Sequence, residues 1–328
     1  MRVYFPILAI PLFLFGSVLG LAQEQDELET PTISVDVQVV NILATVRDKK
    51  GGLVTTLSKE DFVLEEDGKR QEIKYFSQQT DLPLTIGILV DTSVSQQRLL
   101  AIERTGAYEF FEKLLRMEKD LAFLISFDVD IELLQDFTDS KELLYRGLER
   151  LKIQGSGGGM HPSPTPSGLP QVGTAMYDSI YLAAEEMLKG QVGRKALVLV
   201  GDGNDYGSRI KPKEAIASAQ RADAIIYSVR YFDREFYFAT GGMGTGGEGS
   251  LKKLSRETGG TMFEVSRKKP LRWIMDQISA ELRSQYLIGY TPQRDLSQPG
   301  FRKLKLRAKR KGLKVQARAG YYPDAMLD

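Results

Sequence analysis

Unbroken apolar runs alternate with stretches of helical periodicity through the middle of the chain. Leu100, Ala107 and Phe110, for example, fall on one helical face. The six runs that predict strands are 84–90, 121–127, 131–137, 195–201, 224–229 and 261–263. Strands without alternation, interleaved with amphipathic helices, indicate an α/β fold with a doubly wound, mainly parallel sheet. Because only Asp128 to Asp130 separates the second run from the third, these two form a hairpin, and one edge strand should be antiparallel.

Both ends of the chain carry patterns typical of antiparallel strands. Apolar side chains alternate from Ile33 onward. Asp67-Gly68 is the turn signal of a hairpin, whose strands would be 63–65 and 73–76. The tail returns to strand patterns at 286–290, 301–308 and 313–319. Neither piece is large enough to be stable alone, so we expect 32–80 and 284–322 to pack together as a small β-sandwich domain.

The first residues predict export. Met1-Arg2 is followed by a nearly uncharged apolar run to Leu21, and Gly20-Leu21-Ala22 places small residues where a signal peptidase reads them. Residues 1–22 are therefore interpreted as a signal peptide, and the acidic stretch 23–31 as a disordered lead-in. An uncleaved membrane anchor is the alternative, since about 18 apolar residues can span a bilayer. Two prolines within the run favour cleavage, which would leave no stable membrane span.

Composition narrows the choice of compartment and partner. The net charge of +1 gives no reason to expect nucleic acid as a partner. The chain contains no cysteine, which excludes disulfides and lipid attachment at a processed N-terminal Cys. Exported proteins without cysteine are common in bacterial envelopes, so we expect a bacterial protein that is periplasmic or extracellular.

Oxygen-bearing side chains follow two of the predicted strands. Asp91, Ser93 and Ser95 come directly after the strand 84–90, and Asp202 directly follows the strand 195–201. Thr174 opens a helical stretch. In a doubly wound sheet, ligands bind beyond the carboxyl ends of the strands, where the strand order reverses. Carboxylate and hydroxyl oxygens there suit a hard divalent cation, although singly Ser95 and Thr174 could cap helices and Asp202 could stabilise a turn.

The combination of Asp-x-Ser-x-Ser, a distant Thr and a distant Asp resembles the metal-ion-dependent adhesion site (MIDAS) of von Willebrand factor type A (VWA) domains. The resemblance covers residues 81–283, and the five matching residues are Asp91, Ser93, Ser95, Thr174 and Asp202. It implies that the serines and the threonine bind Mg2+, or Mn2+ or Ca2+, while the two aspartates often act through water. One coordination position would then stay open for the carboxylate of a partner.

We interpret the chain as an exported, metal-dependent protein-binding module for adhesion or scaffolding, whose protein ligand presents an Asp or Glu. One alternative is a structural envelope component that its cation stabilises. A Mg2+-dependent hydrolase is less favoured, because the chain has no cysteine and its one histidine, His161, lies in a Pro-rich loop. We therefore expect no enzyme activity. The Gly-rich run 241–247 is interpreted as a flexible loop, since it lacks the Lys-Ser/Thr ending of a phosphate-binding loop.

Overall fold

Six strands form one mixed sheet in the middle of the chain, as the apolar runs predict. The order across the sheet is β10-β9-β8-β5-β6-β7. All neighbours pair in parallel except β6 and β7, which are antiparallel, so the predicted antiparallel edge strand is confirmed. The order reverses between β5 and β8. The strands are β5 (Leu84–Asp91), β6 (Leu121–Phe127), β7 (Ile131–Thr138), β8 (Arg194–Gly201), β9 (Ala224–Arg230) and β10 (Met262–Glu264).

The structure is a computed structural model that describes residues 39–323, except 80, 99, 154–173 and 240–246. Several sequence predictions lie outside these residues. They are the signal peptide, the lead-in, the first part of the N-terminal strand pattern, the Pro-rich loop with His161, and nearly all of the Gly-rich run. Among the described residues, no helix is both long enough and apolar enough to cross a membrane.

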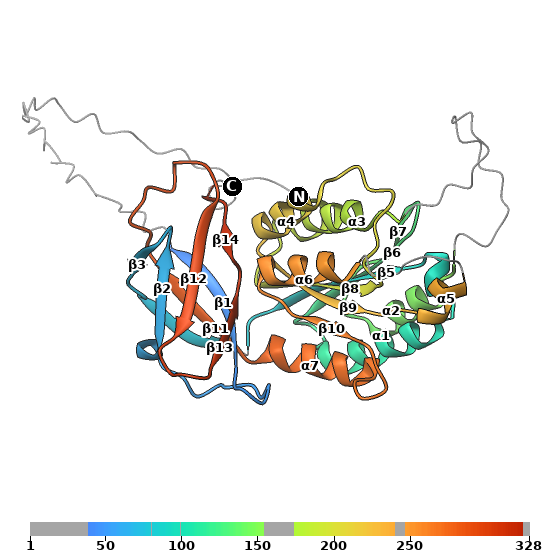
Figure 1. Cartoon of the computed structure of the whole chain (residues 1–328), viewed down its shortest axis with the longest axis horizontal. Coiled ribbons are helices and arrows are strands. Elements are labelled where there is room, and N and C mark those ends of the chain that lie inside the picture. Colours follow the sequence, from blue (N-terminus) through green and yellow to red (C-terminus); the bar gives the residue numbers. More distant parts are fainter. Residues whose placement is uncertain (1–38, 80, 99, 154–173, 240–246, 324–328) are drawn as a thin grey trace, which may run out of the picture. The chain divides into compact units, whose positions relative to one another are not determined.

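Helices cover both faces of the mixed sheet (Figure 1). Alternate side chains of β5 point to opposite faces, so Ile88 packs in the core with α1, α2 and α7, while Leu89 packs in the core with α3, α4 and α6. The first layer consists of α1 (Leu100–Leu114), α2 (Lys141–Glu149) and α7 (Leu271–Arg283). The second consists of α3 (Met176–Leu182), its π-helical continuation η3 (Ala183–Leu188), α4 (Pro212–Arg221) and α6 (Gly247–Thr258). The short η2 (Val94–Gln96) and α5 (Arg234–Ala239) follow β5 and β9.

The two ends of the chain build a β-sandwich. One sheet has the order β13-β1-β11-β4 and the other β14-β12-β2-β3. Side chains from both sheets share one core, in which the rings of Phe62 and Tyr286 meet edge to face with 5.5 Å between their centroids. The first sheet contains β1 (Val40–Arg47), β4 (Tyr75–Gln79), β11 (Gln285–Tyr290) and β13 (Lys314–Ala317). The second, preceded by η1 (Lys59–Asp61), contains β2 (Phe62–Glu66), β3 (Lys69–Gln71), β12 (Arg302–Ala308) and β14 (Gly320–Tyr321).

One strand pairing in the sandwich differs from the prediction. The turn at Asp67-Gly68 is present, and both residues have positive φ, as a tight hairpin turn requires. The partner of β2 across this turn is β3, however, and not residues 73–76. The later segment forms β4, which pairs with β11 in the opposite sheet. The division into domains at 81 and 283 stays a prediction; β4 ends at Gln79 and β11 begins at Gln285.

Candidate metal centre

The loop after β5 turns back on itself and gathers its own oxygens. Asp91 is the last residue of β5 and is 1% exposed. Its Oδ1 accepts a hydrogen bond from the backbone N–H of Ser93 at 2.9 Å. The following turn, η2, contains Ser95, whose Oγ lies 3.0 Å from the Oγ of Ser93. Both hydroxyls of the Asp-x-Ser-x-Ser pattern therefore face the same point.

Asp202 joins this group from the neighbouring strand. It follows β8 directly, is 2% exposed, and accepts a hydrogen bond from Ser95 Oγ on its Oδ2 at 2.8 Å. Its Oδ1 accepts the backbone N–H of Asn204 at 2.9 Å. β5 and β8 are adjacent in the sheet, so the carboxyl ends of two parallel strands bring these residues together at the point where the strand order reverses.

A glycine allows the two strand ends to approach closely. A Cβ on Gly201 would lie 2.6 Å from the Cβ of Asp91 and 2.9 Å from its Oδ2. These distances are shorter than van der Waals contact, so a larger residue at this position would push the Asp91 carboxylate away. Gly201 thus permits the juxtaposition of Asp91 and Asp202.

Thr174 comes from a third segment, and among the described residues its side chain makes no hydrogen bond to the other four residues of the predicted site. It is 6% exposed, and its backbone carbonyl accepts hydrogen bonds from the N–H groups of Tyr206 and Gly207 at 3.2 and 3.3 Å. Those two residues belong to the loop that follows Asp202. The next residue, Ala175, donates its N–H to the carbonyl of Asp128 at 2.6 Å. Thr174 is therefore held between the loops that follow β8 and β6.

Asp178 has a role in this loop that is separate from the cation site. Its carboxylate accepts the backbone N–H groups of Arg209 and Ile210 at 3.1 and 2.7 Å. These contacts fasten the loop after Asp202 to the first turn of α3.

Carboxyl groups are concentrated in the interior at and behind these residues. Burial, followed by the charge of Asp202, raises the pKa of Asp91 to about 8. Burial also raises the pKa of Glu103 well above its usual range, and the charges of Asp91 and Asp202 add to this effect. Glu103, on α1, is 2% exposed, and neither of its carboxylate oxygens has a hydrogen-bond partner among the described residues. A bound cation would compensate such a set of carboxyl groups.

The chemistry of the donors fits a hard cation that hydroxyl groups bind directly. The residues that the structure describes include no cluster of three or more His, Cys, Asp or Glu side chains arranged to hold a metal ion. The hydrogen-bonded group instead combines two carboxylates, from Asp91 and Asp202, with the hydroxyls of Ser93 and Ser95. Mg2+ prefers about six oxygen ligands and commonly keeps several waters, so a set with few direct anions is compatible with it.

Two further residues at this site were not singled out from the sequence. Glu103 carries a recognisable signal, because it falls on the same helical face as Leu100 and Ala107, where an apolar residue is expected. Tyr237, on α5, donates its hydroxyl to Asp202 Oδ2 at 2.5 Å. No sequence pattern indicates this contact, because it depends on the path of the chain after β9.

The order of the strands, the antiparallel edge strand and the helices on both faces of the sheet fit the von Willebrand factor type A fold that the sequence resemblance implies for the α/β part of this chain. The expected fold class is thereby confirmed, together with the sandwich of antiparallel sheets.

Comparison with known proteins gives similar structures only. No family model and no curated protein matches the chain. Similar solved structures include an aerotolerance-related membrane protein from Bacteroides fragilis NCTC 9343, at 18% identity over 61% of this chain and 98% of that one, with a TM-score of 0.43. The vWF domain of the type V pili tip protein Mfa5 from Porphyromonas gingivalis is 13% identical over 62% and 95%, with a TM-score of 0.43.

A third similar structure is proximal thread matrix protein 1 from the mussel byssus, described with a zinc occupied MIDAS motif. It is 13% identical over 66% of this chain, with a TM-score of 0.47. The match spans half the length of that protein, 50%.

Proposed function

We propose that this chain is an exported, metal-dependent protein-binding module. Asp91, Ser93, Ser95, Thr174 and Asp202 would hold Mg2+, or Mn2+ or Ca2+, at the carboxyl end of the mixed sheet. The single observation that supports this most is the hydrogen-bonded group that Ser93, Ser95 and Asp202 form around the end of β5. Two hydroxyls that follow β5 and a carboxylate that follows β8 converge at this point.

The five residues would have two different roles in binding the cation. Ser93, Ser95 and Thr174 would offer neutral hydroxyl oxygens, while Asp91 and Asp202 would orient those hydroxyls and supply charge from behind. A cation held mainly by neutral oxygens supplies an electrophilic point that attracts an anionic oxygen. A protein partner that presents an Asp or Glu has the right chemistry to complete the site, and the surrounding loops would then test the partner's shape.

Thr174→Ala tests the cation site directly. Titration calorimetry of Mg2+ and Mn2+ into the mature chain, which would begin at Gln23, should show saturable binding at one site. The Thr174→Ala variant should lose most of this binding, because one hydroxyl ligand is missing. Thr105→Ala, at an exposed position on α1, is the matched control and should bind as the parent does. Equal binding by parent and Thr174→Ala would contradict the assignment.

The same pair of variants separates a binder from a structural component. For a binder, Thr174→Ala stays folded and stable but loses a protein partner that the parent retains from envelope extract and releases on addition of chelator. For a structural site, the variant instead loses stability, which urea unfolding measures. The parent's retention of a partner in the presence of chelator would refute metal-dependent recognition.

A further inference from the structure

Tyr237 contacts the candidate metal centre from α5, an element that carries none of the five predicted site residues. It lies on α5, a six-residue helix without a buried residue. Its hydroxyl donates to Asp202 Oδ2 at 2.5 Å and accepts a hydrogen bond from Asn204 Nδ2 at 2.7 Å. A phenol is protonated near neutral pH, so this hydroxyl is a donor to the carboxylate. The contact therefore joins a neutral hydroxyl to the carboxylate proposed to orient the cation's ligands.

Oδ2 of Asp202 has no room for a further hydrogen-bond donor. Oδ2 already accepts two hydroxyls, from Ser95 at 2.8 Å and from Tyr237 at 2.5 Å. Oδ1 accepts the backbone N–H of Asn204. A carboxylate oxygen has about two lone pairs to offer, so a cation-bound water can reach Oδ2 only if one of the two hydroxyls leaves. Ser95 belongs to the proposed ligand set, which makes Tyr237 the one to be released.

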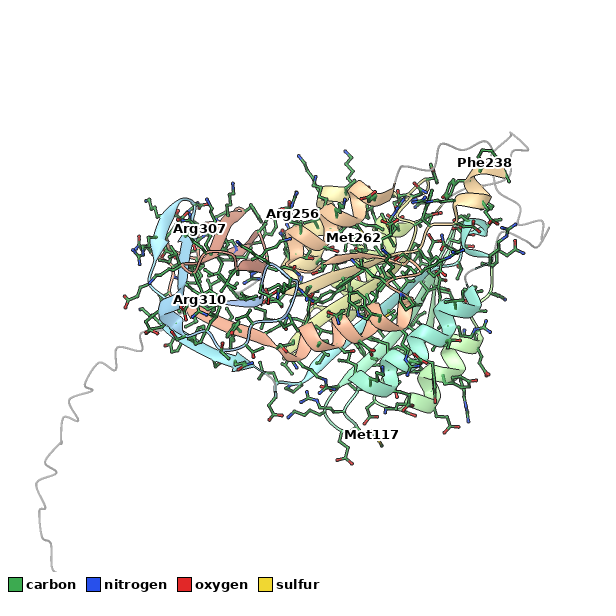
Figure 2. All side chains as sticks on the ribbon, turned by 60° about the horizontal axis from the view of Figure 1, so that its bottom comes forward. Met117, Phe238, Arg256, Met262, Arg307 and Arg310 are labelled. Carbon is green, nitrogen blue, oxygen red and sulfur yellow. The ribbon has the colours of Figure 1, made fainter. Side chains whose placement is uncertain are left out.

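The position of α5 fits an occupant that comes from the solvent side. Asp91 and Asp202 are buried, whereas every residue of α5 is at least partly exposed. Phe238, the neighbour of Tyr237, is 90% exposed and lies at the periphery of the molecule (Figure 2). Tyr237 thus covers the group from the side on which a partner would approach.

An exposed ion pair and an aromatic stack are among the contacts that hold α5 in place. Arg98, in the loop after β5, pairs with Glu235 at 2.9 Å, and the two side chains are 63% and 86% exposed. Exposed pairs of this type contribute little to stability. The ring of Tyr237 stacks on that of Phe232, with 4.8 Å between the centroids and 12° between the planes. The hydrogen bond from Tyr237 joins α5 directly to the buried carboxylate of Asp202.

We propose that Tyr237 is an internal occupant of the cation site, whose hydroxyl holds Asp202 when no cation is bound and leaves when one binds. The inference rests on the proposed function and adds a residue that competes with the cation. Release of Tyr237 would leave space next to Asp202 for a partner's carboxylate. In the absence of metal, the hydroxyl of Tyr237 gives the buried Asp202 a further hydrogen bond beside those from Ser95 and from the backbone N–H of Asn204.

Tyr237→Phe removes the competing hydroxyl and keeps the ring. Calorimetric titration with Mn2+ alone should give about tenfold tighter binding in this variant than in the parent, because a hydrogen bond to a charged group no longer has to be broken. Asn204→Ala, which loses the side-chain support of the same phenol, should shift the affinity in the same direction by a smaller factor. Tyr75→Phe is the matched control, since Tyr75 lies on β4 and is 52% exposed, and should leave the affinity unchanged.

Amide hydrogen exchange provides a second measurement. If Tyr237 only stabilised the fold, Mn2+ would not change the exchange rates in α5. In the parent, Mn2+ should increase amide exchange in residues 234–239, because α5 is released. In Tyr237→Phe, exchange there should already be high and should not respond to Mn2+. Equal or weaker Mn2+ binding by Tyr237→Phe would overturn the role of Tyr237 alone. Absence of Mn2+ binding in both proteins would overturn the proposed cation site, and this inference with it.

Discussion

Glu103 is the residue at which the interior departs furthest from an ordinary apolar core. It occupies the buried face of α1, and both of its carboxylate oxygens lack hydrogen-bond partners among the described residues. Its pKa is raised well above the usual range, chiefly by burial and then by Asp91 and Asp202. The folded protein therefore keeps a proton on Glu103 that the unfolded chain releases above about pH 4.3. Stability must fall as the pH rises from there towards the raised pKa.

Glu103→Gln should remove this pH dependence in the absence of divalent cations. We expect the gain of the variant over the parent to grow from pH 5 to pH 8 by up to about 1.4 kcal/mol for each pH unit, since no proton has to be retained in the fold. Urea unfolding in EDTA at the two pH values measures the difference. Glu112→Gln, at an exposed position on the same helix, should show no such gain. A gain of equal size at pH 5 and pH 8 would mean that Glu103 does not titrate as described.

Individual site residues differ in how far the sequence predicts their positions. Asp91, Ser93, Ser95 and Asp202 could be placed together in advance, because residues after adjacent parallel strands meet at one edge of a sheet. Glu103 could have been found as a charge on an apolar helical face. Tyr237 could not, because α5 follows a loop whose path depends on tertiary contacts such as the Phe232 stack.

At the scale of elements, the candidate site depends on how closely the ends of β5 and β8 approach. The two strands pair in parallel from Leu84 with Arg194 to Val90 with Val200. Where the pairing ends, Gly201 lets the backbone of β8 pass the Asp91 side chain. The strands themselves were predictable from their unbroken apolar runs. The pairing of β3 with β2 was not predicted, because residues 69–71 are polar and carry no strand pattern. The turn at Asp67-Gly68, and not an apolar pattern, fixes the register of this pairing.

Gly201→Ala should disturb the site more than an ordinary glycine replacement. The added Cβ would lie 2.6 Å from that of Asp91, so we expect a loss of about 1–3 kcal/mol in the free energy of unfolding, together with weaker Mn2+ binding. Urea unfolding and calorimetry measure the two effects. Gly249→Ala on α6, where an added Cβ meets no atom within 4 Å, is the control. Unchanged Mn2+ affinity in Gly201→Ala would show that the position of Asp91 does not matter for binding.

At the scale of the whole molecule, the sandwich is tied to the last helix of the α/β part by a buried ion pair. Arg47, at the end of β1, donates its Nε–H to Glu281 Oε1 on α7 at 3.1 Å, and a second nitrogen of the same guanidinium also binds this oxygen. The Glu281 side chain is fully buried. Burial raises the pKa of Glu281, and the hydrogen bond from Arg47 opposes that effect. The pair therefore couples elements from opposite ends of the described chain.

Arg47→Met should uncouple these elements, because it removes the cation that pairs with the buried Glu281. Removal of one member of a buried pair costs about 3–5 kcal/mol. Glu281→Gln should cost less, and the double variant should be more stable than the sum of the single changes predicts.

Urea unfolding of these variants can be followed by two signals. One is the fluorescence of Trp273, the only tryptophan, which lies on α7, and the other is far-ultraviolet circular dichroism, which also senses the sandwich. In the parent the two signals should change together. In Arg47→Met, α7 should unfold at lower urea than the sandwich, whereas coincident transitions in every variant, with additive costs, would show that this pair does not join the two parts energetically.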